Sequence, residues 1–227
     1  MIPRSLTIYE EILLLALDDD KGTADSAGFY TKALGGAILA ELAMTGAVTI
    51  EDDKKKRVHA VRGARLDDPI LAECYAMVTE AKKPKKAQEW VMKFSGLKDL
   101  KNRAARGLVD KGVLTEETGT VLRIFKRTIF PEVDGGPEQE LRERMKKAIF
   151  TATTNLDART VVVIALAQAA GMLDKVFPKK KLKERKKRLE QLTSGQLAGK
   201  ATKEAVQAVQ TAIMVAAIMP AVFVATN

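Results

Sequence analysis

The feature that most constrains the fold is a short sequence pattern, L-x-x-x-G-x-[VL]-T, that occurs twice. The first copy consists of Leu42, Gly46, Val48 and Thr49, and the second of Leu108, Gly112, Leu114 and Thr115. In the first copy, apolar residues with helical spacing precede the glycine, and the two-residue alternation of a strand follows it. The glycine stands where the period changes, a position that favours positive φ and hence a residue without Cβ. The pattern therefore predicts two modules, each a helix that runs directly into a β-hairpin.

Most of the remaining sequence is typical of helices. We expect helices after the candidate N-cap Ser5, after Asp68-Pro69, after Pro84, from about 98 to 111, and over 138–151, 158–173, 179–192 and 200–223. The stretch VVVIALAQAA at 161–170 is apolar all round and is expected at the centre of a bundle. Hairpin turns are expected at 51–56 and at 116–119, the latter between strands 113–115 and 121–127. No Pro/Gly/Ser-rich linker divides the chain, so one domain over 1–227 is expected.

Residue types that commonly carry catalysis or bind metals are scarce. The single cysteine, Cys74, and the single histidine, His59, leave no internal disulfide and no thiolate or imidazole cluster for zinc. The sequence has no P-loop, no G-x-S-x-G elbow and no H-E-x-x-H motif. The neighbouring carboxylates Glu10 and Glu11 are interpreted as part of a solvated helix face. We therefore expect no catalytic residues, no metal and no cofactor, and a protein that is not an enzyme.

Neither end of the sequence has the pattern of a targeting or membrane-spanning segment. Glu10 and Glu11 interrupt the apolar run near the N-terminus, and no small-residue cleavage site follows it. The apolar segment 211–225 is about fifteen residues long, shorter than the ~20 needed to span a bilayer, and Pro220 interrupts it. We expect a buried helix there. With its single cysteine, the chain is expected in the reducing cytoplasm.

Positive charge is concentrated in one segment. The formal net charge is +9, and KKKLKERKKR at 179–188 alone holds eight basic residues and one acidic residue. A patch of this kind attracts an anionic polymer or an anionic membrane. The basic groups at 54–57 and 82–86 are interpreted as solvated loops. A further basic group falls on the predicted helix 98–111, and it consists of Lys98, Lys101, Arg103 and Arg106.

The second hairpin combines apolar and basic residues. Lys98 and Lys101 are separated by three positions, which puts them on one helix face close to where this hairpin returns. Val121 and Leu122 are expected at an exposed tip, beside Arg123, Lys126 and Arg127. An apolar tip surrounded by cations is suited to dip into a charged bilayer surface.

Four ordered blocks of the sequence resemble one protein family. They are LTIYEEILLLAL, GAILAELAMTGAV, LVDKGVLT and DARTVVVIALAQAAGMLD, and the match extends from about Leu6 to the C-terminus. The chain resembles the Golgi phosphoprotein 3 family, whose yeast member is a vacuolar sorting protein. The resemblance implies a mainly α fold with a helical bundle core, a protruding β-hairpin and a second small hairpin. It also implies a basic pocket for phosphatidylinositol 4-phosphate in a peripheral Golgi membrane protein. Family members retain glycosyltransferases by their cytoplasmic tails and are not known as enzymes.

The resemblance carries several site residues onto this sequence. Counted without gaps from Gly36, the family's pocket arginine falls on Gly35 and its pocket tryptophan on Ser26, so neither side chain is kept. Phe29 or Tyr30 would then have to supply the aromatic group, and we assign Tyr30 to the site.

The family's two helix arginines fall on Lys98 and Lys101. Lysine keeps the charge but lacks the bidentate fork of arginine. The membrane-dipping pair falls on Val121 and Leu122. The long basic tail of eukaryotic members has no counterpart before Leu6, so the chain looks like a minimal, prokaryotic-type relative.

The leading hypothesis is a non-enzymatic peripheral membrane protein of the cytoplasm. It would bind anionic phospholipid headgroups resembling phosphatidylinositol 4-phosphate through Lys98, Lys101, Arg103 and Tyr30. Val121 and Leu122 would insert into the bilayer, and cytoplasmic tails of membrane proteins are further partners. An alternative is a nucleic-acid-binding protein, because a helix followed by a two-stranded wing is also the plan of winged-helix modules. A third is a scaffold for a short acidic or membrane-proximal peptide.

Overall fold

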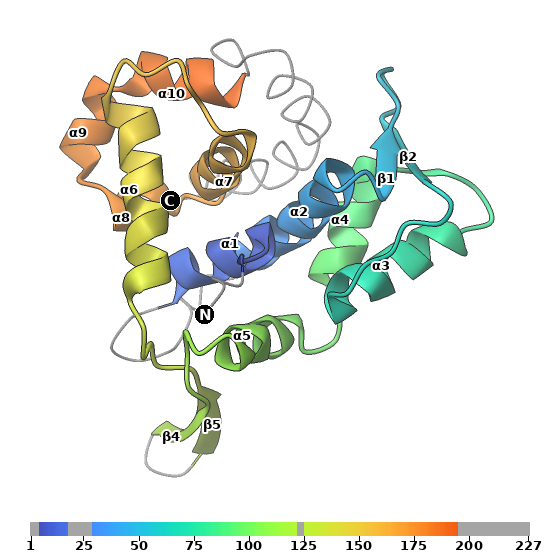
Figure 1. Ribbon diagram of the computed structural model, residues 1–227, viewed down its shortest axis with the longest axis horizontal. Coiled ribbons are helices and arrows are strands. Elements are labelled where there is room, and N and C mark those ends of the chain that lie inside the picture. Colours follow the sequence, from blue (N-terminus) through green and yellow to red (C-terminus); the bar gives the residue numbers. More distant parts are fainter. Residues whose placement is uncertain (1–4, 18–28, 122–124, 195–227) are drawn as a thin grey trace, which may run out of the picture.

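The computed structural model describes residues 5–17, 29–121 and 125–194 (Figure 1). Their helices are α1 (Ile8–Ala16), α2 (Phe29–Met44), α3 (Pro69–Thr79), α4 (Ala87–Ser95), α5 (Leu100–Asp110), α6 (Gly136–Phe150), α7 (Ala158–Ala169), α8 (Leu173–Val176), α9 (Lys179–Glu184) and α10 (Lys186–Thr193). Their strands are β1 (Val48–Ile50), β2 (Arg57–Ala60), β3 (Lys85–Lys86), β4 (Glu117–Val121) and β5 (Phe125–Ile129). The mainly α class with small hairpins is confirmed.

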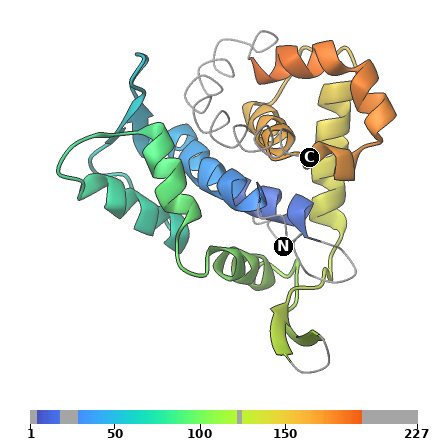
Figure 2. The ribbon, with the colours of Figure 1, turned by 180° about the vertical axis from the view of Figure 1, so that it is seen from behind.

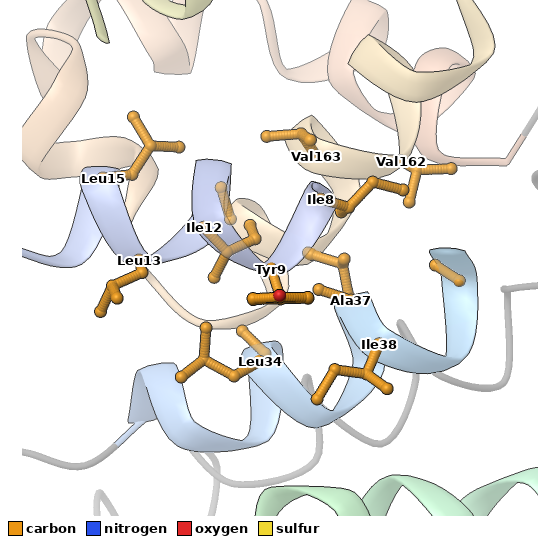
Figure 3. Close-up of a cluster of buried hydrophobic side chains, with 14 of the residues drawn as sticks. Ile8, Tyr9, Ile12, Leu13, Leu15, Leu34, Ala37, Ile38, Val162 and Val163 are labelled. Atoms are coloured by element: carbon orange, nitrogen blue, oxygen red, sulfur yellow. The ribbon is translucent and has the colours of Figure 1, made fainter. Parts of the chain in front are cut away.

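Helices α1 and α2 lie in the middle of the molecule. The α6–α10 group packs at one end of them and α3, α4 and the first sheet at the other, while α5 leads to the hairpin β4–β5 (Figures 1 and 2). Side chains of α1 lie between α2, which contributes Leu34, Ala37 and Ile38, and α7, which contributes Val162 and Val163 (Figure 3). All residues of α1 are buried. The apolar stretch of α7 is buried as expected.

The N-cap of the first helix is Thr7, two residues later than the predicted cap Ser5. Thr7 is the N-cap, since its side chain accepts a hydrogen bond from the Glu10 amide and the Glu10 carboxylate accepts one from the Thr7 amide. This reciprocal capping box satisfies two backbone donors at the start of the helix.

Three glutamates of α1 and α2 are buried, and the prediction that Glu10 and Glu11 are solvated is wrong. Glu10 is 1%, Glu11 4% and Glu41 7% exposed. Lys111, at the end of α5, donates to Glu10. Burial without such partners would cost several kcal/mol for each carboxylate. The charges are therefore buried because cations from distant parts of the chain meet them.

Two arginines complete this network. Arg144 of α6 donates to Glu11 at 2.8 Å, and Arg159 of α7 donates to the same oxygen at 3.4 Å. Arg159 also forms a bidentate pair with Glu41, both bonds being 3.1 Å. Burial raises the pKa of Glu11, although both arginines act to lower it. The network joins α1 to α2, α5, α6 and α7.

Both repeated glycines adopt the predicted backbone. Gly46 has φ 73° and Gly112 has φ 74°, the left-handed region that glycine enters at little cost. After Gly46, β1 pairs antiparallel with β2 around an exposed turn at 52–55, as expected. The predicted loop at 82–86 is partly wrong, because Lys85 and Lys86 pair with β2 as a third strand.

The second hairpin is displaced along the sequence from its prediction. The predicted turn at 116–119 is wrong, because Gly119 lies within β4 opposite Arg127, and Val121 lies opposite Phe125. Val113 and Leu114, predicted as hairpin strand, are instead buried against the core, and Leu114 forms a bridge with Glu132. The strands begin beyond these two anchoring residues, and Val121 opposite Phe125 is the last strand pair that the structure describes.

The basic segment 179–192 divides into two helices at Arg185. Its predicted apolar seam is confirmed, since Leu182, Leu189 and Leu192 are buried. Arg188 donates to the carbonyl oxygens of Ala148 at 3.0 Å and Thr153 at 2.5 Å, which ties α10 to the end of α6. The expected helix at 200–223 and the apolar segment 211–225 lie outside the described residues. Among the described helices, none has both the length and the apolar character required to cross a bilayer.

The buried network predicts a large cost for removing its central cation. Arg159→Met leaves Glu11 and Glu41 buried with less compensation, so the free energy of unfolding should fall by about 3–5 kcal/mol. Urea denaturation measures this loss. Lys146→Met removes the cation of an exposed ion pair with Glu143, whose side chains are 58% (Lys146) and 62% (Glu143) exposed. This change should lower the free energy of unfolding by less than about 1 kcal/mol. Equal losses in the two variants would contradict the role given to Arg159.

Burial also predicts an unreactive cysteine. Cys74 is fully buried, and burial raises the pKa of its thiol to about 12. Since the thiolate is the reactive form, a disulfide reagent at pH 8 should label the folded chain far more slowly than the chain unfolded in guanidinium. Rapid stoichiometric labelling of the folded chain would be inconsistent with this burial.

Candidate functional site

Lys98 and Lys101 occupy different settings around the start of α5. Helix α5 begins at Leu100, later than expected, because Asp99 adopts a left-handed conformation with φ 56°. Lys98 is therefore exposed in the turn before the helix, and Lys101 is half-buried in its first turn. The prediction that both lie on one helix face is wrong.

The two arginines of α5 are held by carboxylates. Arg103 donates to Glu73 of α3. Arg106 forms a bidentate pair with Glu116, in which Nε lies 3.1 Å and Nη2 3.0 Å from the two carboxylate oxygens. Its remaining nitrogen, Nη1, lies 3.5 Å from Asp99. The hydrogen bond from Arg106 lowers the pKa of Glu116, and Glu116 raises the pKa of Arg106.

Sequence reasoning missed the partner of Arg106. Glu116 lies ten positions after Arg106, on the far side of the left-handed Gly112. At Gly112 the chain reverses direction, and this glycine is visible in the sequence. It could have been used to predict that a residue after the glycine lies beside the preceding helix. The predicted turn at 116–119 concealed it by assigning Glu116 to the tip.

The aromatic and arginine positions carried over from the resemblance lie on and before α2. Tyr30 is half-buried in the first turn of α2 and packs against the core. Ser26 lies outside the described residues. A Cβ at Gly35 would lie 2.5 Å from the carbonyl oxygen of Val91 and 2.8 Å from the amide nitrogen of Ser95. Close packing of α2 on α4 therefore requires glycine there, and Gly35 contributes no side chain to a pocket.

The hairpin β4–β5 projects from the body beside α5 (Figures 1 and 2). Val121 is the last residue of β4, next to the end of the hairpin, while Leu122 lies outside the described residues. The pair Arg106–Glu116 joins α5 to the residue that precedes β4.

The basic helices α9 and α10 lie far from this hairpin. In both views they are at the opposite end of the molecule (Figures 1 and 2). A pocket of about 340 Å³ lies beside them, and its lining includes buried Leu182 and Leu189 as well as Lys183 and Lys186. The largest concentration of positive charge and the Lys98–Lys101 region are therefore separate surfaces.

The described residues contain no group of three or more His, Cys, Asp or Glu side chains arranged to hold a metal. The Nε2 atom of His59, on β2, lies 2.7 Å from one carboxylate oxygen of Glu51. The other carboxylate oxygen of Glu51 accepts a hydrogen bond from Arg57. These contacts cross-link the first sheet, and Cys74 is buried elsewhere in the core.

Comparison with known proteins identifies the family. The model of the family described as Golgi phosphoprotein 3 (GPP34) matches residues 8–209. A curated relative, vacuolar protein sorting-associated protein 74 of Eremothecium gossypii, is 26% identical over 206 residues. That alignment covers 76% of this chain and 62% of the relative, so the chain spans less than two thirds of the relative's length. Because the match extends over most of its sequence, the chain belongs to the Golgi phosphoprotein 3 family.

Proposed function

We propose that this chain is a peripheral membrane protein that binds anionic phospholipid headgroups. The observation that carries the proposal is the hairpin β4–β5, which projects beside α5 (Figure 1). Its strand β4 ends at Val121, and in the sequence Leu122 follows, so this apolar pair is proposed to insert into the bilayer. The exposed Lys98 and the half-buried Lys101 supply positive charge at the start of α5, whereas the chain passes into the hairpin from the other end of this helix. Tyr30 and Arg103 are the further headgroup contacts in this proposal.

Several cations must act together for such binding to be stable. Each basic residue near an anionic surface contributes on the order of 1 kcal/mol, and salt screens the attraction. Lysine offers phosphate a point charge and no planar fork, so headgroup discrimination should be weaker than at a site built on arginines. A phosphorylated inositol lipid such as phosphatidylinositol 4-phosphate fits best, because it presents more negative charge than a singly charged headgroup.

Family membership supports a Golgi-associated role. The family description names the Golgi, and the printed name of the fungal relative names vacuolar protein sorting. From these two descriptions we further propose an adaptor role. In this role the chain is cytoplasmic and non-enzymatic, and it holds cytoplasmic tails of membrane proteins at the bilayer.

The nucleic-acid alternative is less well supported. A winged-helix module needs one helix with a free face for the major groove. In the first module, α2 is buried on several sides, and its buried residues include Leu34, Ile38, Leu39 and Leu42. In the second, carboxylates hold Arg103 and Arg106. A gel-shift with random duplex at low salt tests this alternative, since non-specific binding is strongest there.

Charge reversal at the two candidate surfaces tests the proposal. Lys98→Glu with Lys101→Glu should remove most binding to vesicles containing phosphatidylinositol 4-phosphate, measured by co-sedimentation at one fixed salt concentration. Lys186→Glu with Lys187→Glu changes charge equally at the opposite end and should remove less than about half.

Vesicles of neutral lipid alone are the control. Equal binding to neutral and anionic vesicles would rule out headgroup recognition. Equal losses in the two double variants would instead assign the membrane contact to both ends of the molecule.

A further inference from the structure

Arg106 has the geometry of an anion-binding residue that already holds an anion. All three nitrogens of its guanidinium face carboxylates, two of them in a bidentate pair with Glu116 and the third 3.5 Å from Asp99. The Arg106 side chain is 49% exposed, Asp99 43% and Glu116 38%, so solvent reaches every member of the group. The group is open to exchange of one anion for another.

The position of Arg106 on α5 differs from that of Lys101. Five residues along a helix turn the side chain by roughly 140°, so the two cations point to different sides of α5. The buried stripe of Leu100, Ala104 and Leu108 fixes this orientation. Arg106 thus lies on the outer surface of α5, away from the stripe that packs on the core.

Phosphate and carboxylate offer arginine the same kind of partner. A planar guanidinium fork bonds two oxygens of either group, and phosphate carries the larger charge. We propose that Arg106 is a phosphate-binding residue and that Glu116 occupies its fork when no phosphate is bound. The ligand class is a phosphate monoester, and identifying its source as a lipid headgroup rests on the proposed membrane function.

Replacement of Glu116 by phosphate on Arg106 would affect the hairpin as well as the charge around Arg106. Glu116 directly precedes β4, so its pair with Arg106 ties the base of the hairpin to α5. An exposed pair contributes little to stability, so phosphate can replace Glu116 with little loss of folding free energy. Bound phosphate therefore releases the hairpin base from α5.

Four variants in two assays test the inference. The first assay titrates inorganic pyrophosphate, a soluble phosphate, and follows the Arg106 Nε–H signal by NMR together with calorimetric affinity. Glu116→Gln should bind pyrophosphate about fivefold more tightly than the unmodified chain. Arg106→Gln and the double variant should both lack this gain. Glu143→Gln removes an equivalent exposed carboxylate on α6 and is the control.

The same variants are then tested on vesicles containing phosphatidylinositol 4-phosphate. Tighter vesicle binding by Glu116→Gln, dependent on Arg106, supports a lipid source of the phosphate. A gain in the pyrophosphate assay without vesicle binding by any variant supports the Arg106 site and overturns the membrane function. Unchanged pyrophosphate affinity in Glu116→Gln overturns the inference, as does a gain that persists in the double variant or appears equally in Glu143→Gln.

Discussion

The arrangement of the helices depends on the pairing of buried carboxylates with cations from distant segments. A carboxylate within the core is tolerated only when charged hydrogen-bond donors reach it, so each pair fixes the relative position of two helices. Arg159 alone contacts Glu11 on α1 and Glu41 on α2, and it also donates to the carbonyl oxygen of Leu6. Apolar packing supplies most of the driving force, whereas these directional contacts allow only one register of α1 between α2 and α7.

The same network positions the candidate site. Lys111 follows α5 and donates to Glu10, so the C-terminal end of α5 is fixed on α1 directly before the left-handed Gly112. A Cβ at Gly107 would lie 2.9 Å from a Glu10 carboxylate oxygen, which shows how closely the two helices approach. From this fixed point the chain passes through buried Val113 and Leu114 into the hairpin. The direction of the hairpin is therefore set by the core.

Local signals were predictable from the sequence, and long-range partners were not. Gly46, Gly112 and Asp68 act within a few residues, so their patterns identified the two left-handed turns and the start of α3. The partners of Glu10 and Glu11 lie 101 and 133 or more positions away, beyond any periodicity argument. The left-handed Asp99 moved the start of α5, since a non-glycine residue at positive φ has no reliable sequence signal. Hence the existence of a basic α5 surface was predicted, while its division between Lys98, Lys101 and Arg106 was not.

The placement of α9 and α10 gives the molecule a strongly asymmetric charge. Most of the net charge of +9 belongs to the segment 179–188, at the end opposite the hairpin (Figures 1 and 2). At long range an anionic surface acts on this charge asymmetry, and at low ionic strength it attracts the α9–α10 end first. For the proposed membrane function, an orientation with the hairpin toward the surface would then have to come from short-range contacts. In the membrane function proposed above, encounter and final docking would thus be governed by opposite ends of the molecule, and ionic strength would change the balance between them.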